Sequence, residues 1–378
     1  MVDAGRITEE FRRLVSFDAP SYEEREIAGY LKKKLKSLGL SVTEDAAAKE
    51  LRKEDQSRRN TASNIYAKLP GTKAGEPVLF SAHLDTVSPA IGKKAIVRPD
   101  GTITSAGDTV LGADDVSGLT AILEALTVIR EQNLPHPDIE ILLTVAEEPY
   151  CSGSRFIEYE RLTAKRGYVL DLTGPVGTAA IKAPSILSVQ AVVKGHAAHA
   201  GFEPEKGINA LTITAAALAK IRTGRVRKDL TVNFGTIRGG TGKNIVPAEV
   251  VTEGEIRSTN GRLAIAEAER IRKIFTETAE RYHGTAQVFI TEHVRAYSVP
   301  KQTKTVRMYR KAVSEALRCT TPECIVTYGG SDANRLNEHG IETIVVACGM
   351  QNCHSTQEST TVEELTRAAS IVLALMTQ

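Results

Sequence analysis

Several residues in this sequence carry side chains that bind metal ions or transfer protons, and each stands next to a short apolar run or a helical pattern. They are His83, Asp85, Asp114, Asp115, Glu147, Glu148, Asp171 and His354. Imidazole and carboxylate groups ligate divalent transition metals, and they also serve as general acids and bases. Together they indicate metal-assisted chemistry, provided that the fold brings them together.

The apolar runs explain how residues so far apart in sequence could meet. They lie at residues 78–82, 139–145, 168–170 and 343–348. Runs that are continuous rather than alternating are typical of strands buried on both faces of a parallel sheet. Sites in such sheets form at the carboxyl ends of the strands. We therefore expect the candidate ligands to converge in one crevice.

An ordinary structural interpretation competes with this one. A single histidine or acidic pair at a strand end is usually a solvated loop residue, with a prior for metal binding of about one in ten. The whole set reverses these odds, because crowded carboxylates repel each other and lose hydration unless cations are present. The adjacent like charges at 114–115 and 147–148 increase this repulsion. We expect a bound cation to resolve it.

The ligand types favour zinc, with cobalt or manganese as alternatives, over calcium or magnesium. In the expected arrangement, His83 and Asp171 hold one ion. Glu148 and His354 hold the other, and Asp114 bridges both. With a bridging hydroxide, the charges of two divalent ions and three carboxylates cancel. A water shared by two zinc ions ionises near neutral pH and would be the nucleophile.

This arrangement leaves Asp85 and Glu147 free for other roles. Asp85 follows His83 by two residues and could accept the proton on the other ring nitrogen, which would fix the ring's orientation. Glu147 adjoins Glu148 and could take the proton of the metal-bound water and return it to a leaving amine. The predicted reaction is hydrolysis of an amide or peptide bond, with Glu147 as general base.

The rest of the chain predicts an α/β domain with a second domain inserted into it. Helices are expected at residues 22–39 and 119–129, and a polar surface connection at 44–63. Strands are expected at 185–193, 230–237, 248–258 and 287–294, and helices at 209–221 and 262–282. This β-α-β-β-α-β order is typical of a ferredoxin-like sandwich. We expect a catalytic domain of residues 1–183 and 295–378, and an inserted domain of residues 184–294.

Composition narrows the class of protein. The 378 residues include 48 Lys and Arg against 46 Asp and Glu, for a net charge of +2, and 42% are hydrophobic. These values disfavour disorder and a dedicated polyanion binder. The first twenty residues lack a secretory signal pattern, and no run of 18 apolar residues occurs, so we expect a cytoplasmic protein without a membrane partner. The 5 cysteines include no C-x-x-C pair, so we expect reduced thiols, mostly in the core.

The candidate motifs resemble the successive metal-site motifs of the M20 dizinc metallopeptidases. The run LGADDVSG at residues 111–118 makes the resemblance strongest to peptidase T-type tripeptide aminopeptidases. It covers nearly the whole chain. It implies a zinc-peptidase-like mixed-sheet domain, an inserted ferredoxin-like α+β lid that is often used for dimerisation, two Zn²⁺ per chain and a small peptide substrate. A homodimer through the lid is a further expectation.

Roles carried over by the resemblance agree with those above, with Asp114 as the bridging ligand and the Asp114–Asp115 peptide bond cis. In the lid, His199 resembles the family histidine that helps polarise the scissile carbonyl. Asn244 and Arg257 resemble residues that contact substrate carboxylate or backbone. Val116 stands where peptidase T-type sequences commonly have lysine, which puts substrate preference in question. No role follows for Ser331 or Asp332.

Three alternative interpretations remain, the first of which covers two related enzymes. An N-acyl amino acid deacylase or a carboxypeptidase would use the same dimetal site. A non-catalytic metal- or peptide-binding protein with a decayed site is disfavoured because Glu147 and every expected ligand are in place. A nucleic-acid binder would rest only on the basic stretches at residues 32–36 and 52–59. A solvated helix face is the simpler interpretation of the first stretch, so we expect no nucleic-acid partner.

Overall fold

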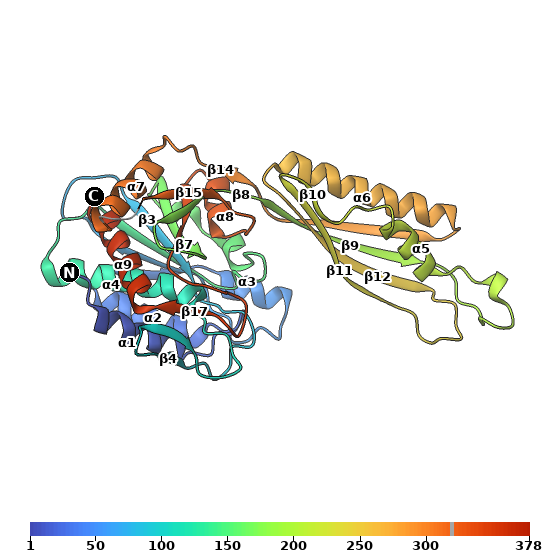
Figure 1. The fold of residues 1–378 in the computed structure, drawn as a ribbon, viewed down its shortest axis with the longest axis horizontal. Coiled ribbons are helices and arrows are strands. Elements are labelled where there is room, and N and C mark those ends of the chain that lie inside the picture. The colour runs from blue at the N-terminus through green and yellow to red at the C-terminus, as the bar shows by residue number, and fades with distance from the viewer. Residues whose placement is uncertain (318–320) are drawn as a thin grey trace. The chain divides into compact units, whose positions relative to one another are not determined.

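The computed structural model of this chain describes residues 1–317 and 321–378. The chain forms two compact units, drawn in Figure 1. The first unit comprises Met1–Lys182, Ser298–Thr327 and Ser331–Gln378, and the second comprises Ala183–Tyr297 with Tyr328–Gly330. The second unit is therefore an insertion in the chain of the first.

The first unit is built on a nine-stranded sheet with the order β1-β2-β6-β3-β7-β16-β8-β14, in which β15 also pairs with β8. Its strands are β1 (Ser41–Glu44), β2 (Ile65–Leu69), β3 (Val78–His83), β6 (Ile139–Thr144), β7 (Arg166–Leu172), β8 (Thr178–Ala183), β14 (Tyr297–Ser298), β15 (Glu323–Val326) and β16 (Glu342–Ala347). The four apolar runs are confirmed as strands β3, β6, β7 and β16. These strands are parallel to their neighbours within the set. The sheet as a whole is mixed, as the family resemblance implied, because β2 is antiparallel to β6 and β8 is antiparallel to β16.

Helices pack against this sheet and against each other. They are α1 (Ala4–Val15), α2 (Arg25–Ser37), α3 (Ala47–Glu54), α4 (Ala113–Gln132), α7 (Lys304–Ala316), α8 (Asp332–Glu338) and α9 (Val362–Thr377), with short 3₁₀ turns η1 (Gly153–Phe156) and η2 (Tyr159–Arg161). The covering helix expected at 119–129 is confirmed as α4, which contacts β3, β7, α1 and α9. It begins at Ala113, so Asp114 and Asp115 lie in its first turn, where their backbone angles are not helical. None of the helices in the described ranges is long and apolar enough to cross a membrane.

The expected surface connection at 44–63 is partly wrong, because α3 lies within it. Ala47 and Leu51 are fully buried, while the rest of the helix is mostly charged. One apolar pair at i, i+4 is too little to stand out in a window of eleven or more residues. The helix is therefore stabilised by packing that its own sequence pattern does not reveal.

A small antiparallel sheet with the order β17-β5-β4 completes the first unit. Its strands are β4 (Ala95–Val97), β5 (Thr102–Ser105) and β17 (Ser359–Thr361). Because β17 pairs with β5, this sheet holds the C-terminal end of the loop that connects β16 to β17. That loop carries His354.

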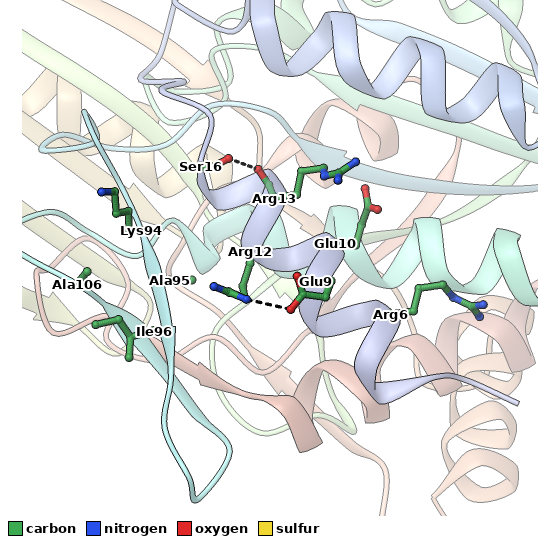
Figure 2. Close-up of a pocket in the computed structure, with 10 residues that line it drawn as sticks. All are labelled: Arg6, Glu9, Glu10, Arg12, Arg13, Ser16, Lys94, Ala95, Ile96 and Ala106. Carbon is green, nitrogen blue, oxygen red and sulfur yellow. Dashed lines mark hydrogen bonds and ion pairs between the residues drawn. The ribbon is translucent and has the colours of Figure 1, made fainter.

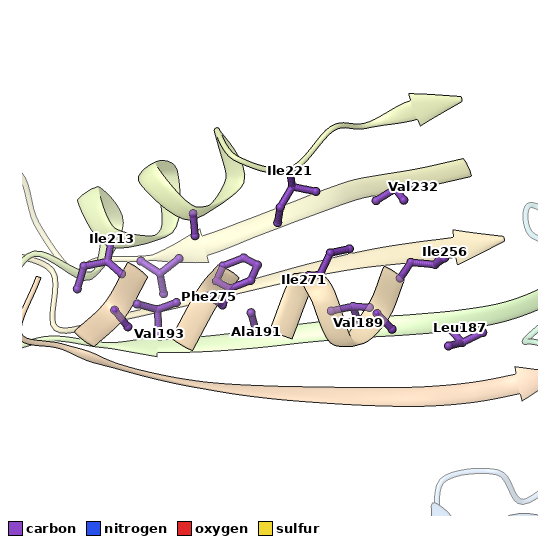
Figure 3. Packing of buried hydrophobic residues seen from close by; sticks show 14 of the residues in the cluster. Leu187, Val189, Ala191, Val193, Ile213, Ile221, Val232, Ile256, Ile271 and Phe275 are labelled. Carbon is purple, nitrogen blue, oxygen red and sulfur yellow. The ribbon is translucent and has the colours of Figure 1, made fainter. Parts of the chain in front are cut away.

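The second unit is a five-stranded antiparallel sheet with the order β10-β11-β12-β9-β13. Its elements are β9 (Ser185–Lys194), η3 (Pro204–Lys206), α5 (Ala210–Leu218), β10 (Gly224–Arg227), β11 (Leu230–Gly239), β12 (Glu249–Ser258), α6 (Gly261–Arg281) and β13 (Thr285–Val294). The ferredoxin-like order is confirmed, with β10 as an added edge strand. Both helices pack on the sheet through one apolar cluster, which includes Ile271 and Phe275 of α6 and Val189 and Val193 of β9 (Figure 3).

Candidate metal centre

The candidate ligands of the first unit gather where its parallel strands end. His83 is the last residue of β3, Asp171 is the sixth residue of β7, and Asp114 lies in the first turn of α4. Glu148 follows β6, and His354 lies between β16 and β17. The structure places these ligands in two groups, His83 with Asp114 and Asp171, and Asp114 with Glu148 and His354. In each group the potential ligand atoms lie within 4.8 Å of one another.

Asp114 belongs to both groups because its two carboxylate oxygens point to different histidines. Its Oδ1 lies 3.1 Å from Nε2 of His83, and its Oδ2 lies 3.3 Å from Nε2 of His354. Asp171 Oδ1 is 3.9 Å from the same nitrogen of His83. Glu148 Oε2 is 3.1 Å from that of His354. This geometry suits a carboxylate that bridges two cations.

The backbone around Asp114 is unusual. The Asp114–Asp115 peptide bond is cis, which confirms the geometry implied by the family resemblance. The carboxylate of Asp115 accepts hydrogen bonds from the backbone N–H groups of His83 at 3.1 Å and Gly118 at 3.1 Å. Asp115 thus ties the end of β3 to the start of α4, so that the side chain of Asp114 faces the site.

The expected role of Asp85 needs a correction. Nδ1 of His83 lies 2.9 Å from the backbone carbonyl oxygen of Asp85, whereas the Asp85 carboxylate is 3.5 Å away. That carboxylate instead accepts hydrogen bonds from the backbone N–H groups of Glu147 at 2.9 Å and Glu148 at 3.2 Å. Ser21 donates a third, at 2.7 Å. Asp85 therefore orients the histidine through its main chain and holds the 147–148 segment through its side chain.

Two further buried carboxylates, which the sequence reasoning missed, hold the loops of the site. Glu358 accepts hydrogen bonds from the backbone N–H groups of Gly112 at 2.7 Å and Asp114 at 2.9 Å. Glu24 accepts one from the N–H of Ala146 at 3.1 Å. The only sequence signal for Glu358 is its position four residues after His354.

Glu147 precedes the candidate ligand Glu148 and lies beside a thiol and another carboxyl group. Cys151 Sγ donates a hydrogen bond to Glu147 Oε1 at 3.1 Å. Asp332, at the start of α8, offers an oxygen within 4.8 Å of both. Ser331, for which no role was predicted, caps α8 by accepting a hydrogen bond from the N–H of Ala333. These contacts place Asp332 next to the proposed base.

Burial and crowding shift the ionisation of these groups. Burial mainly raises the pKa of Glu147 well above its usual value, and the charges of Asp332 and Glu148 add to this effect. Burial opposes ionisation of Asp114 as well, but hydrogen bonds from His354 and His83 outweigh it and lower the Asp114 pKa. Hydrogen bonds to Asp114 and Glu148 raise the pKa of His354 to about 10. The metal-free site therefore retains protons that bound cations would replace.

The residues fit a pair of transition-metal ions. Glu148 Oε1 is buried and has no hydrogen-bond partner among residues 1–317 and 321–378, although its other oxygen contacts His354. A buried carboxylate oxygen without a partner is costly, and a cation would satisfy it. The donor set of two imidazoles and three carboxylates is typical of zinc, cobalt or manganese. Both the types of ligand in the first unit and their positions therefore suit a metal site.

Four of the cysteines lie in the described part of the chain, and none of these four forms a disulfide. Cys151 and Cys348 are buried, while Cys324 and Cys353 are partly exposed, and all four are free thiols. The expectation of core thiols therefore holds for two of these four. Cys319 lies outside the described residues.

The predicted lid residues all lie in the second unit. His199 Nδ1 accepts hydrogen bonds from the N–H groups of Gly201 and Phe202, both at 3.1 Å, and its ring stacks on Phe202. The carbonyl of Asn244 accepts from the N–H of Ala200. Arg257 pairs with Glu255 and donates to the carbonyl of Tyr328. Contact with substrate stays a prediction for these three residues.

A surface pocket elsewhere in the first unit holds none of the candidate residues. It has a volume of about 770 Å³ and lies between α1 and β4 (Figure 2). Of its basic residues, Arg12 pairs with Glu9, and Arg6 pairs with Glu124 and Glu131. Its mixture of paired charges does not resemble a catalytic site. The basic helix α2 is similar, because Lys32 and Lys34 pair with carboxylates.

Comparison with known proteins identifies the family. The model of the peptidase dimerisation domain of M20 proteins matches residues 181–283, and that of peptidase family M28 matches residues 64–221. The uncharacterized protein YqjE of Bacillus subtilis is 36% identical over 376 residues, which are 100% of this chain and 99% of that protein.

Two solved structures are similar over nearly their whole length. A tripeptidase from Staphylococcus aureus is 33% identical with a TM-score of 0.93, covering 100% of this chain and 98% of that one. The aminopeptidase PepT from Bacillus cereus is 37% identical with a TM-score of 0.89 and the same coverage, 100% and 98%. This chain therefore belongs to the M20 family of peptidases and resembles its peptidase T-type members.

Proposed function

We propose that this protein is a dizinc aminopeptidase that hydrolyses small peptides such as tripeptides. The observation that carries the proposal is the position of Asp114 between two ligand groups, each with one histidine and one further carboxylate. One ion would be held by His83 and Asp171 and the other by Glu148 and His354. Asp114 would bridge them.

When bound, a pair of divalent cations polarises a carbonyl group and lowers the pKa of water. Glu147 would serve as the general base, because it is buried beside Glu148 and its raised pKa suits a group that accepts a proton and then returns it. Asp85 positions Glu147 by accepting the hydrogen bond from its backbone N–H. In this mechanism the carboxylate of Glu147 would accept one proton and later release it.

The substrate class rests on the relatives. The similar structures from Staphylococcus aureus and Bacillus cereus are a tripeptidase and an aminopeptidase. His199, Asn244 and Arg257 of the second unit would contact the substrate carbonyl, backbone or carboxylate. The match of this unit to a peptidase dimerisation domain supports a homodimer formed through it.

A substrate series tests this function. We expect turnover of an unblocked tripeptide and reduced but measurable turnover of the same peptide amidated at its C-terminus, because an aminopeptidase requires the free amine, whereas a contact with the C-terminal carboxylate contributes only to binding. N-acetylation of the tripeptide should abolish turnover. If only an N-acetyl amino acid is hydrolysed, the protein is a deacylase, and loss of turnover on amidation alone indicates a carboxypeptidase. The Glu147→Gln variant is the control for contaminating peptidases.

A further inference from the structure

A third group of potential ligands lies beside the proposed dimetal site. It consists of Glu147, Cys151 and Asp332, all buried, with one ligand atom from each within 4.8 Å of the others. We propose that this group binds an additional soft or borderline divalent cation, such as Cd²⁺ or Zn²⁺, and that the bound ion inhibits the enzyme. The inhibition depends on the proposed role of Glu147 as the base, whereas binding of the ion does not.

The positions of the sulfur and oxygen atoms suit such an ion. Cys151 Sγ lies 3.1 Å from Glu147 Oε1. Tetrahedral zinc has bonds of about 2.3 Å to sulfur and about 2.0 Å to oxygen, so its ligand atoms stand about 3.5 Å apart. A movement of a few tenths of an ångström is therefore enough for these two ligands. The loop favours their approach, because Tyr150 and Cys151 adopt left-handed φ values of 60° and 53° and turn the chain back toward Glu147.

Asp332 provides an independent indication of a missing ligand. Its Oδ2 accepts a hydrogen bond from the hydroxyl of Thr144. Its Oδ1 is buried without a hydrogen-bond partner in the part of the chain that the structure describes, and the residue is only 2% exposed. An unpaired buried carboxylate oxygen is unfavourable unless a cation or proton compensates it. Two carboxyl groups and a thiol that lie this close together can serve as three ligands of one cation.

The thiol decides which ions would bind. Cysteine thiolate prefers soft or borderline ions such as Cd²⁺ and Zn²⁺ to Mg²⁺ or Ca²⁺. The two groups around Asp114 contain only imidazole and carboxylate ligands. Binding at the third group would form a metal–sulfur bond and release the thiol proton to solvent. A thiolate-to-metal absorption band would therefore distinguish this site from the dimetal site.

Occupation of the third group would remove the base. Coordination of a cation would lower the basicity of the Glu147 carboxylate, so that it would no longer accept a proton effectively. Enzyme with the dimetal site filled should thus be active, and enzyme that has bound one more ion should be inactive. Activity would then rise with added metal and fall again at higher concentrations.

The test is a Cd²⁺ titration of enzyme already loaded with its catalytic metal, with ultraviolet absorption, bound metal per chain and tripeptide turnover measured on the same samples. We expect a thiolate band that grows as activity falls. Cys151→Ala should abolish the band and raise the half-inhibitory concentration by about tenfold or more, because the thiolate is the strongest ligand for a soft ion. Asp332→Asn should keep the band but weaken binding, and it serves as the second variant should Cys151→Ala fold poorly.

Two cysteines provide matched controls. Cys353 adjoins the proposed ligand His354, and Cys348 is a buried thiol that donates to the carbonyl of Leu170. Cys353→Ser and Cys348→Ser should retain the band. Absence of a band in the unmodified enzyme, or a band that survives Cys151→Ala, would overturn the proposal. A band that requires Cys151 in a protein without peptidase activity would instead uphold the metal site and reject the proposed function.

Discussion

The carboxylate of Glu358 accepts a hydrogen bond of 2.9 Å from the backbone N–H of Asp114. The same side chain, only 1% exposed, also accepts one of 2.7 Å from the N–H of Gly112. Glu358 thereby fixes the residue that we propose as the bridge between two metal ions. Its role is to position Asp114, since it does not itself belong to either ligand group.

Replacement of Glu358 should therefore weaken metal binding. Glu358→Ala leaves two buried N–H groups without their acceptor, at a cost of about 1–3 kcal/mol for each. Loss of a group that orients a ligand typically lowers metal affinity by about 10–100-fold. Chelator competition and thermal unfolding measure the two effects. Glu358→Gln, which keeps one acceptor oxygen, should lie between the alanine variant and the unmodified protein, and equal affinity in all three would exclude this role.

Glu147→Gln should separate metal binding from turnover. The amide preserves the size of the side chain but cannot accept a proton in the way the carboxylate does. We expect kcat to fall by about 10²–10⁴-fold, the usual contribution of general acid–base catalysis. Bound metal should remain at about two ions per chain, measured by elemental analysis. A variant that keeps its metal and most of its turnover would show that Glu147 is not the base.

His83→Ala and His354→Ala should lose metal together with activity. Each substitution removes the only imidazole of one ligand group, so each should lower the bound metal toward one ion per chain or less. His339→Ala is a suitable control, because His339 lies in the same unit, is exposed and stacks on Tyr159. Metal contents that are equal in the three variants would contradict the assignment.

Metal affinity should rise with pH. Hydrogen bonds to Asp114 and Glu148 raise the pKa of His354 to about 10 in the metal-free protein, so a cation must displace its proton throughout the neutral range. Each displaced proton makes the apparent affinity rise by about tenfold per pH unit. Affinity measured by chelator competition between pH 6 and 8 should show this slope, and His354→Ala should reduce it by about one proton. A flat profile would mean that the site does not retain protons.

The sequence was most informative where ligands follow buried strands. His83, Glu148 and Asp171 could be grouped because parallel strands end at one edge of a sheet. Asp85 shows the limit, since its position two residues after His83 does not reveal whether its carbonyl or its carboxylate faces the ring. Glu358 and Asp332 could not be placed, because only tertiary packing brings the loop before β17 and the start of α8 to the site.

The metal content of the active protein tests the central claim most directly. Elemental analysis of protein with measured tripeptide turnover should give about two divalent transition-metal ions per chain. Removal of the metal with a chelator should abolish turnover, and addition of zinc, cobalt or manganese should restore it. Full turnover in protein without bound transition metal would contradict the account.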